Sequence, residues 1–329
     1  MTLTDPTTTQ TTTRAYLLTH YGPDGLTPGS APAHAPGPGE VSVRLEAIAI
    51  NPLDAKIRSG LLAQMLPLPL PVVIGSDAAG TVLAVGAGVT GFSAGDRVAG
   101  FFDSGAFAET AVSRATRLTR IPGGLSTAQA AALPTAAETA TRILGMLEPA
   151  PASTVVVNGA AGSVGSLLTQ LLVRDGHTVI GTARPENHDY LRSLGATPIA
   201  YGPDMVDDLR RLAPEGIDAA FDTAGNGFIA RVVGIVDAPR IVTIIDFAAG
   251  AAGAIVAAGD PTALTITDAV RDVFDRAASG DLRVEIGAAY RFDDLPDAVA
   301  LSEGGHARGK IIVVGAGVDP AQIGIDATA

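Results

Sequence analysis

A glycine-rich turn between an apolar segment and an amphipathic one constrains the fold of this chain more than any other feature. The segment Thr154–Val157 is apolar, and it leads through Ala160-x-Gly162-x-x-Gly165 into a predicted helix over Ser163–Arg174. One face of that helix is apolar, because hydrophobic residues recur at helical spacing: Val164, Leu167, Leu168, Leu171 and Leu172. A second predicted strand, His177–Thr182, follows at once. The pattern therefore predicts a β-α-β unit of a parallel sheet.

The small residues of this turn have separate physical roles. Gly162 lets the backbone approach a pyrophosphate, and Gly165 lets the helix pack closely on the strand. The helix start at Ser163 and Val164 presents unpaired N–H groups and the positive end of the helix dipole to phosphate oxygens. A turn that merely joins strand to helix is the alternative. The complete β-α-β context favours a dinucleotide site, which includes Ala160.

The end of the second strand bears on which dinucleotide is bound. An NAD site places Asp or Glu there, about 20 residues after the glycines, to bind the ribose 2′-hydroxyl. Here the chain reads Gly181-Thr182-Ala183-Arg184, without an acidic residue. The Thr182 hydroxyl and the Arg184 guanidinium suit a 2′-phosphate instead, with further polar contacts from His188 and Tyr201. We therefore predict NADP(H) as the cofactor, with an ordinary solvated loop arginine as the alternative for Arg184.

Strands and helices continue to alternate beyond this unit. A helix is predicted over Glu186–Leu194, and further strands over Ile217–Phe221 and Arg240–Ile245. Because ligands bind beyond the carboxyl ends of parallel strands, the loops after these two strands should flank the coenzyme. Those loops contain Thr223 in one case and Asp246 with Phe247 in the other. Phe247 could stack near the nicotinamide, and an exposed loop aromatic is the alternative.

The chain before the alternating region has another pattern. Val41–Ile50 alternates apolar and other residues, and short apolar runs between glycines fill Val72–Val98. Both predict a small antiparallel β unit, roughly a partial barrel. The Pro- and Gly-rich segment 27–39 is expected to be an irregular connector. Ser126-x-x-Gln129 is typical of a capping box and predicts a helix start. Mixed strands return near the end of the chain, with Lys310–Val314 as the last.

Composition excludes several classes of function. The formal charge of −12 argues against a nucleic-acid surface or a polybasic membrane contact. Cysteine is absent, which excludes disulfides, thiolate nucleophiles and sulfur-ligated zinc, and the five histidines show no metal-ligand spacing. No apolar run approaches the ~20 residues of a membrane span. Residues 1–13 are threonine-rich and do not resemble a signal peptide, so we expect a disordered leader and a cytoplasmic protein.

Five motifs, in order along the chain, resemble the medium-chain dehydrogenase/reductase superfamily, specifically its zinc-independent quinone/enone oxidoreductase branch, the zeta-crystallin-like group. The resemblance covers nearly everything from residue 14 to residue 314. Besides the phosphate loop, the motifs are Asn51-Pro52-Leu53-Asp54-Ala55-Lys56-Ile57-Arg58-Ser59-Gly60, Gly75-Ser76-Asp77-Ala78-Ala79-Gly80, Gly95-Asp96-Arg97-Val98 and His306-Ala307-Arg308-Gly309-Lys310.

The resemblance implies an α/β fold with two domains. A doubly wound Rossmann domain that binds NADP, residues 135–277, would be inserted into an irregular, partly barrel-like (GroES-like) β catalytic domain, residues 14–134 and 278–329. The active site would lie in the cleft between them. Relatives are commonly dimers, so a homodimer is a further expectation, with a small molecule as the substrate.

The resemblance also indicates what this chain lacks. Zinc alcohol dehydrogenases of the superfamily carry an early Cys ligand, and a Gly-His-Glu motif where this chain has Gly75-Ser76-Asp77. The Lewis acid that polarises an alcohol or carbonyl oxygen would therefore be missing. Hydride transfer to a quinone, or to the β-carbon of an α,β-unsaturated carbonyl, is the reaction that remains. A non-redox cyclase or isomerase, or a binding protein on the same fold, is the alternative.

The resemblance places three candidate catalytic residues in the first motif. Lys56 stands where similar enone reductases often have Lys, and it would stabilise the enolate or supply the proton, with bound water as the competing donor. On an extended segment Asp54 would share the face of Lys56 and orient its ammonium, with a simple ion pair as the alternative. Asn51 would line the nicotinamide side, and a turn-forming Asn is the alternative.

Two other positions carry expectations from the resemblance. Thr139 matches a family threonine near the nicotinamide. Its neighbour Glu138 departs from the apolar residue of the family, and we favour a solvated helix face for it over a carboxylate near the cleft. Lys310, in the last motif, is expected to be structural or near the cofactor phosphate.

Overall fold

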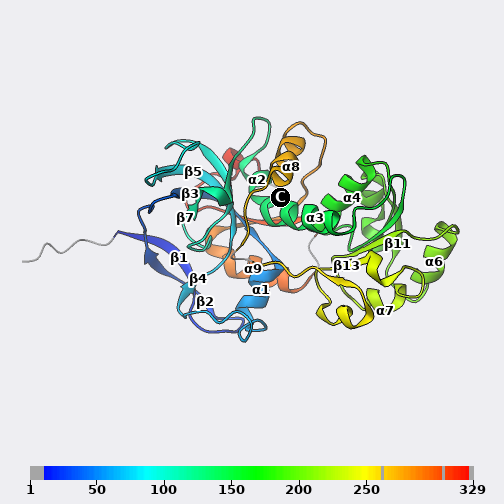
Figure 1. The fold of residues 1–329 in the computed structure, drawn as a ribbon. Helices are drawn as coiled ribbons and strands as arrows, with labels where there is room; N and C mark the ends of the chain where they lie inside the picture. The colour runs from blue at the N-terminus through cyan, green and yellow to red at the C-terminus, as the bar shows by residue number, and fades with distance from the viewer. Residues whose placement is uncertain (1–10, 261–262, 306–307, 326–329) are drawn as a thin grey trace, which may run out of the picture.

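The structure, a computed structural model, describes residues 11–260, 263–305 and 308–325. Two main sheets lie at opposite ends of the molecule in Figure 1, with β3, β5 and β7 in one and β11 and β13 in the other. Helices α2 and α3 lie between them. Within the described ranges, no helix is both long enough and apolar enough to cross a bilayer.

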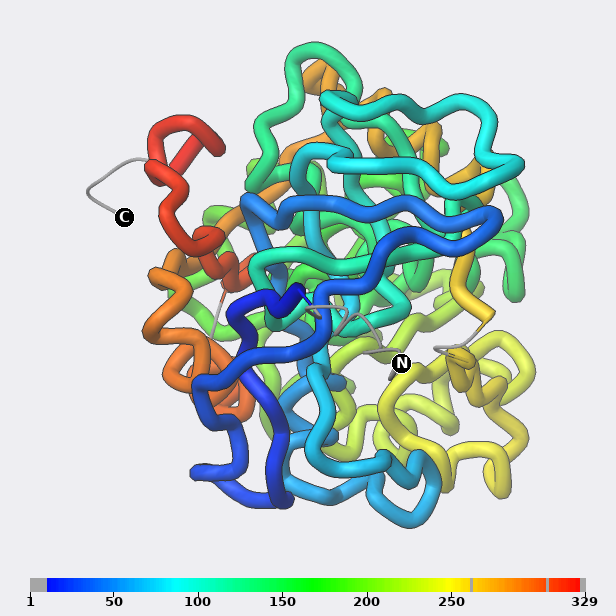
Figure 2. The backbone as a smooth tube through the Cα atoms, turned by 90° about the vertical axis from the view of Figure 1, so that its left-hand side faces the viewer, coloured from blue at the N-terminus to red at the C-terminus, as the bar shows by residue number. Residues whose placement is uncertain are grey.

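The seven-stranded sheet joins the two ends of the chain. Its strand order is β15-β16-β3-β5-β6-β8, and β7 pairs with β3. Strand β16, from the C-terminal part, runs antiparallel to β3. In Figure 2 the C-terminal part of the chain, in orange and red, lies beside the N-terminal part, in blue. Helices α1 (Pro52–Arg58) and α9 (Leu295–Glu303) pack together beside this sheet. The predicted β unit is confirmed, with strands β3 (Glu40–Ile50), β5 (Asp77–Val85), β6 (Arg97–Phe101), β7 (Thr110–Arg114), β8 (Leu118–Arg120), β15 (Ile286–Arg291) and β16 (Lys310–Val314).

A smaller sheet of β1 (Thr12–Leu18), β2 (Leu26–Pro32) and β4 (Val72–Val73) contradicts two expectations. The expected leader over 1–13 is wrong at its end, because β1 begins at Thr12, while residues 1–10 lie outside the described ranges. The connector expected over 27–39 is also wrong in its first half, which forms β2. Its prolines are tolerated because β2 is an edge strand, where a missing N–H costs no ladder hydrogen bond.

Helices α2 (Thr127–Ala132) and α3 (Pro134–Leu147) separate the two sheets. The Ser126 hydroxyl accepts the N–H of Gln129 at 3.1 Å, and the Gln129 amide oxygen accepts the N–H of Ser126 at 3.1 Å. The predicted capping box is therefore confirmed. Pro134 begins α3 at a position where its missing N–H would have no intrahelical partner. One hydrophobic cluster contains both helices together with residues of both sheets, so the sheets and helices share a core.

The second main sheet is entirely parallel, in the order β11-β10-β9-β12-β13-β14. The chain moves outward from β9 to β11 and then crosses back to β12, so the strand order reverses beside β9. Open α/β sheets bind ligands at this switch point, and the doubly wound sheet is confirmed. Its elements are β9 (Thr154–Asn158), α4 (Ser163–Arg174), β10 (Thr178–Ala183), α5 (His188–Ser193), β11 (Thr197–Ala200), α6 (Met205–Leu212), β12 (Ala219–Asp222), α7 (Phe228–Val232), β13 (Ile241–Thr243), β14 (Ile255–Val256) and α8 (Asp268–Ala278). The domain bounds 14–134 with 278–329, and 135–277, stay a prediction.

Candidate coenzyme-binding and active site

The glycine-rich turn lies at the carboxyl end of β9, at the switch point of the sheet. Gly165 is required by the protein itself, because a Cβ there would lie 2.2 Å from the carbonyl oxygen of Gly159. Gly159 has φ +80°, and a Cβ would meet the side chains of Ala224 and Thr223 at 2.7 and 2.8 Å. Both glycines therefore have an internal reason: they let α4 and the neighbouring loop approach β9 closely.

Gly162 has no such internal reason. A Cβ on it would meet only the Gly159 carbonyl oxygen, at 3.4 Å, which is an ordinary contact. Gly162, Ser163 and Val164 are half-exposed, and the N–H groups of Val164 and Gly165 form no hydrogen bond within the described ranges. A glycine that the protein does not need, beside free N–H groups at a helix start, fits a ligand phosphate that approaches the backbone. The turn therefore suits the pyrophosphate of a dinucleotide.

Two residues expected to touch the coenzyme are instead buried beneath the turn. Ala160 is 0% exposed, and its N–H donates to the Thr182 carbonyl oxygen at 3.1 Å. Thr182 is also 0% exposed; its hydroxyl donates to Asn158 Oδ1 at 2.6 Å and accepts the N–H of Gly159 at 3.1 Å. The contacts expected from Ala160 and from the Thr182 hydroxyl are therefore wrong, because these groups shape the turn from below.

Three other predicted residues do gather at the end of β10. Arg184 is exposed directly after the strand, and its guanidinium forms no hydrogen bond or ion pair with any described residue. Burial raises the pKa of the Tyr201 hydroxyl, while the adjacent Thr182 hydroxyl and the Arg184 charge oppose that shift. The His188 ring nitrogen Nε2 lies 3.4 Å from the carbonyl oxygen of Ala183. This end of the strand therefore offers a free cation and two polar rings.

A buried chain of side-chain hydrogen bonds crosses the carboxyl ends of four adjacent strands. Asn158 Nδ2 donates to Asp222 Oδ1 at 2.7 Å, and the Thr243 hydroxyl donates to Asp222 Oδ2 at 2.9 Å. Thr182 extends the chain from the other side of Asn158. These four residues are at most 1% exposed. Sequence reasoning missed Asn158 and Thr243, although polar residues at the ends of otherwise apolar strands were the signal that could have found them.

The loops after β12 and β13 are only partly available to a ligand. The Thr223 hydroxyl donates to the Asn158 carbonyl oxygen at 2.7 Å, so it supports the turn. Asp246 is half-buried, and one of its carboxylate oxygens accepts the N–H of Ala248 at 3.1 Å. Phe247 is 55% exposed, which agrees with the alternative that it is an exposed loop aromatic.

The first motif forms helix α1 rather than an extended segment. Asn51 precedes the helix with extended backbone angles, as expected before Pro52, and its N–H donates to Asp54 Oδ2 at 2.7 Å. Residues two apart on a helix point to different sides, so Asp54 is buried while Lys56 is half-buried. The expectation that Asp54 orients Lys56 is therefore wrong, and so is the simple ion pair. The Lys56 ammonium has no hydrogen bond or ion pair with a described residue.

The second lysine, Lys310, belongs to a buried polar cluster below Asn51. It is 3% exposed, donates to Asn51 Oδ1, and lies 3.6 Å from Asp77 Oδ2. Asp77 is 0% exposed and accepts the N–H of Thr135 at 3.0 Å. Sequence reasoning quoted Asp77 within a motif without a role for it. A lone acid among small residues in Gly75–Gly80 was the signal.

This cluster holds Asp54 in an unusual electrostatic environment. Burial raises the pKa of the Asp54 carboxyl to about 7, and the negative charge of Asp77 adds to this effect. The hydrogen bond from the Asn51 N–H and the charge of Lys310 act in the opposite direction. Asp54 is therefore a carboxyl that can change its protonation near neutral pH.

The cluster also touches the phosphate turn. Gly309 forms a short parallel bridge with Gly162, and its N–H donates to the carbonyl oxygen of Ala161 at 3.4 Å. Lys310 follows Gly309 directly, and its place near the cofactor phosphate stays a prediction. The first residues of that motif, His306 and Ala307, lie outside the described ranges. Asn51 is thus linked, through Lys310, to the turn that suits the pyrophosphate.

Glu138 on α3 does not lie on a solvated helix face, which corrects that expectation. Its side chain is 14% exposed and accepts a hydrogen bond from Arg142 Nε at 2.7 Å. The Thr139 hydroxyl donates to the same carboxylate at 3.3 Å, and Arg142 also donates to the Ala257 carbonyl oxygen at 3.2 Å. Ala257 follows β14, so this pair lies at the carboxyl edge of the parallel sheet.

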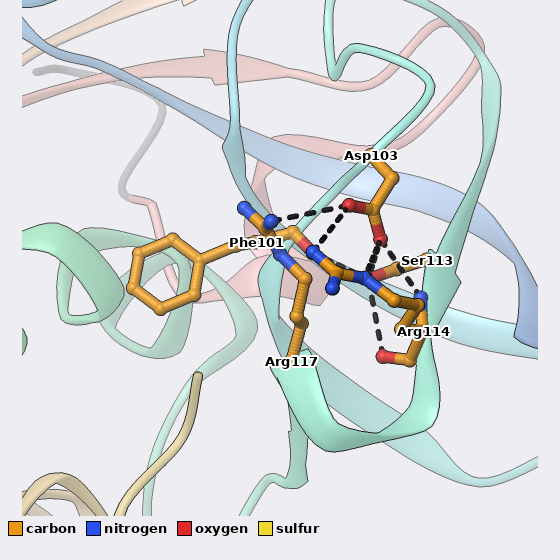
Figure 3. A network of polar contacts seen from close by, with 5 residues as sticks. All are labelled: Phe101, Asp103, Ser113, Arg114 and Arg117. Carbon is orange, nitrogen blue, oxygen red and sulfur yellow. Dashed lines mark hydrogen bonds and ion pairs between the residues drawn. The ribbon is translucent and has the colours of Figure 1, made fainter. Parts of the chain in front are cut away.

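A second charged network supports β6, which pairs Phe101 with Asp77 of β5. Figure 3 shows Asp103 between the guanidinium groups of Arg114 and Arg117, both at 3.1 Å. Arg117 also lies over the Phe101 ring, 5.6 Å from its centroid. Burial would raise the pKa of Asp103, but the hydrogen bonds from Arg114 and the charge of Arg117 lower it overall. All charges of this network are paired with one another, so it serves structure.

Comparison with known proteins agrees with this architecture. The family model described as Alcohol dehydrogenase GroES-like domain matches residues 37–123, and the model described as Zinc-binding dehydrogenase matches residues 194–313. No group of three or more His, Cys, Asp or Glu side chains that could hold a metal ion occurs in the described part of the chain.

Relatives extend the match over most of the chain. The human Synaptic vesicle membrane protein VAT-1 homolog is 38% identical over 227 residues, which are 66% of this chain and 57% of that protein. The chain thus spans little more than half the length of that relative. The chloroplastic NADPH-dependent alkenal/one oxidoreductase of Arabidopsis thaliana is 32% identical, over 83% of this chain and 72% of that protein.

A solved structure shows the same fold. The quinone oxidoreductase from Coxiella burnetii superposes with a TM-score of 0.82 at 27% identity, over 92% of this chain and 99% of that one. The resemblance on which the site residues were chosen is confirmed. The chain belongs to the medium-chain dehydrogenase/reductase superfamily, and it is similar to quinone and alkenal/one oxidoreductases.

Proposed function

We propose that this protein uses NADPH, without zinc, to reduce a quinone or the carbon–carbon double bond of an α,β-unsaturated carbonyl. One observation carries the choice of coenzyme: a free Arg184 guanidinium stands at the end of β10, where an NAD site would have a carboxylate. A guanidinium offers a fork of donors to a 2′-phosphate. The name of the Arabidopsis relative, an NADPH-dependent oxidoreductase, agrees with this choice.

The residues of the chain would bind the coenzyme along the carboxyl edge of the parallel sheet. The α4 start receives the pyrophosphate, and Arg184 with His188 and Tyr201 receives the phosphorylated ribose. Thr139, whose hydroxyl donates to Glu138, would lie at the nicotinamide end. When bound, NADPH supplies the hydride.

Lys56 is the candidate that would act on the acceptor. Hydride addition to an enone leaves negative charge on the carbonyl oxygen and then requires a proton at the α-carbon. A half-buried ammonium without an internal partner can donate to that oxygen and stabilise the charge as it forms.

The test is coenzyme consumption by the purified protein. We expect loss of the reduced-nicotinamide absorbance with a simple quinone or a short alkenal, and a lower KM for NADPH than for NADH. Saturable binding of NADPH without its oxidation by any acceptor would instead favour a non-redox cyclase or isomerase, or a binding protein. Absence of NADPH binding would overturn the proposal. Homodimerisation and a cytoplasmic location stay predictions.

A further inference from the structure

The side-chain amide of Asn51 is held in one orientation by the buried cluster. An ammonium has only donors, so Lys310 Nζ has to face Oδ1 and not Nδ2. The Asn51 N–H is bound by Asp54, which holds the backbone as well. The Asn51 Nδ2 atom forms no hydrogen bond with a described residue, and it is not fully buried. Asn51 therefore presents one free donor, on the side away from Lys310.

Asp77 determines where Lys310 lies. Besides its ion pair with Lys310 at 3.6 Å, its carboxylate accepts the Thr135 hydroxyl at 2.7 Å and the Ser76 hydroxyl at 2.8 Å. Thr135 lies in the first turn of α3, the helix that also carries Thr139. One buried carboxylate thus connects the residues on both sides of the expected nicotinamide position, Asn51 through Lys310 and Thr139 through α3.

We propose that Lys310 and Asp77 are positioning residues for hydride transfer: they turn the Asn51 amide so that Nδ2 faces the reacting groups. This role rests on the proposed function. Replacement of a buried ion pair by apolar residues of similar volume often leaves stability unchanged or raises it. Stability is therefore a weak explanation for the presence of the Lys310–Asp77 ion pair. Orientation of the Asn51 donor is a stronger explanation for the Lys310–Asp77 ion pair, because a small misplacement in an active site can cost about a hundredfold in rate.

The experiment is a double-mutant cycle in the full-length protein, with NADPH and the best quinone or enone acceptor. We expect Lys310→Met and Asn51→Ala each to lower kcat roughly tenfold to a hundredfold. The Kd for NADPH, followed by the fluorescence of the bound coenzyme, should stay within about twofold. In the Asn51→Ala background, Lys310→Met should lower kcat no further, because both changes remove the same donor.

Two further variants separate orientation from a loss of structure. Asn51→Asp keeps an acceptor for Lys310 but loses the donor, so it should match Asn51→Ala in kcat. Arg58→Met removes another buried cation, paired with Glu303, from the helix that follows Asn51. It should lower the unfolding temperature with little change in kcat. If Lys310→Met does not fold, Lys310→Arg, which is also a pure donor, should retain more activity than Asp77→Asn.

The outcomes distinguish the two proposals. An active wild type with Lys310→Met at wild-type kcat would overturn the positioning role alone, as would effects that multiply in the double variant. A wild type that never oxidises NADPH would overturn the proposed function, and the positioning role with it.

Discussion

The buried carboxyl of Asp54 makes the stability of this protein depend on pH in an unusual direction. Its pKa is raised from 3.8 to about 7, first by burial and then by the charge of Asp77. In the unfolded chain the group returns to its ordinary pKa. Between these two values the folded state binds more protons than the unfolded state, so the free energy of unfolding falls as pH rises.

The magnitude follows from the two pKa values. A difference between 3.8 and about 7 corresponds to roughly 4 kcal/mol over the whole range. The stabilising effect of the protonated form is fully present below pH 3.8 and is lost as pH rises through about 7. Asp54→Asn keeps an acceptor for the Asn51 N–H but does not titrate. The wild type should therefore lose stability relative to this variant between these pH values.

Urea unfolding of both proteins at a series of pH values measures the effect. The wild type should lose several kcal/mol more than Asp54→Asn as pH rises across this range. Asp103→Asn is the matched control, because the pKa of Asp103 is lowered and its stabilisation is lost only as pH falls below its ordinary value. The difference between that variant and the wild type should stay constant in the same range. Parallel pH profiles for the wild type and Asp54→Asn would refute the reasoning.

Three further predictions concern the coenzyme and the acceptor. Gly162→Ala should weaken NADPH binding in a fluorescence titration with an unchanged unfolding temperature, whereas Gly165→Ala should lower that temperature, because its Cβ would lie 2.2 Å from a carbonyl oxygen. Arg184→Ala should raise the KM for NADPH about tenfold or more and leave that for NADH unchanged, since a charge-assisted hydrogen bond contributes ~1.5–3 kcal/mol; an equal KM for NADPH would remove Arg184 from the site. Lys56→Ala should lower kcat with the coenzyme Kd intact, and equal turnover would show that the proton comes from elsewhere.

The local sequence pattern was sufficient to predict an element wherever the residues that determine it are adjacent in the chain. The β-α-β unit with its glycine turn was predicted with the helix at Ser163–Arg174, because strand, turn and helix are adjacent in sequence. The Ser126 capping box depends on residues three apart, so it too was readable. The conformation of the motif Asn51–Gly60 was not predicted correctly. Its helix is only seven residues long, and hydrophobic periodicity alone does not distinguish so short a helix from an extended segment.

The sequence by itself determined the parallel sheet, the place of the phosphate turn and the absence of an acid at the end of β10. Tertiary structure alone decided which polar groups meet. Asn51, Asp77 and Lys310 come together because β16 and β5 both pair with β3, contacts between distant segments that leave no local periodicity. It also decided that Thr182 is buried and that Glu138 pairs with Arg142. Burial is a property of what packs on a side chain, and that packing is decided by distant parts of the chain.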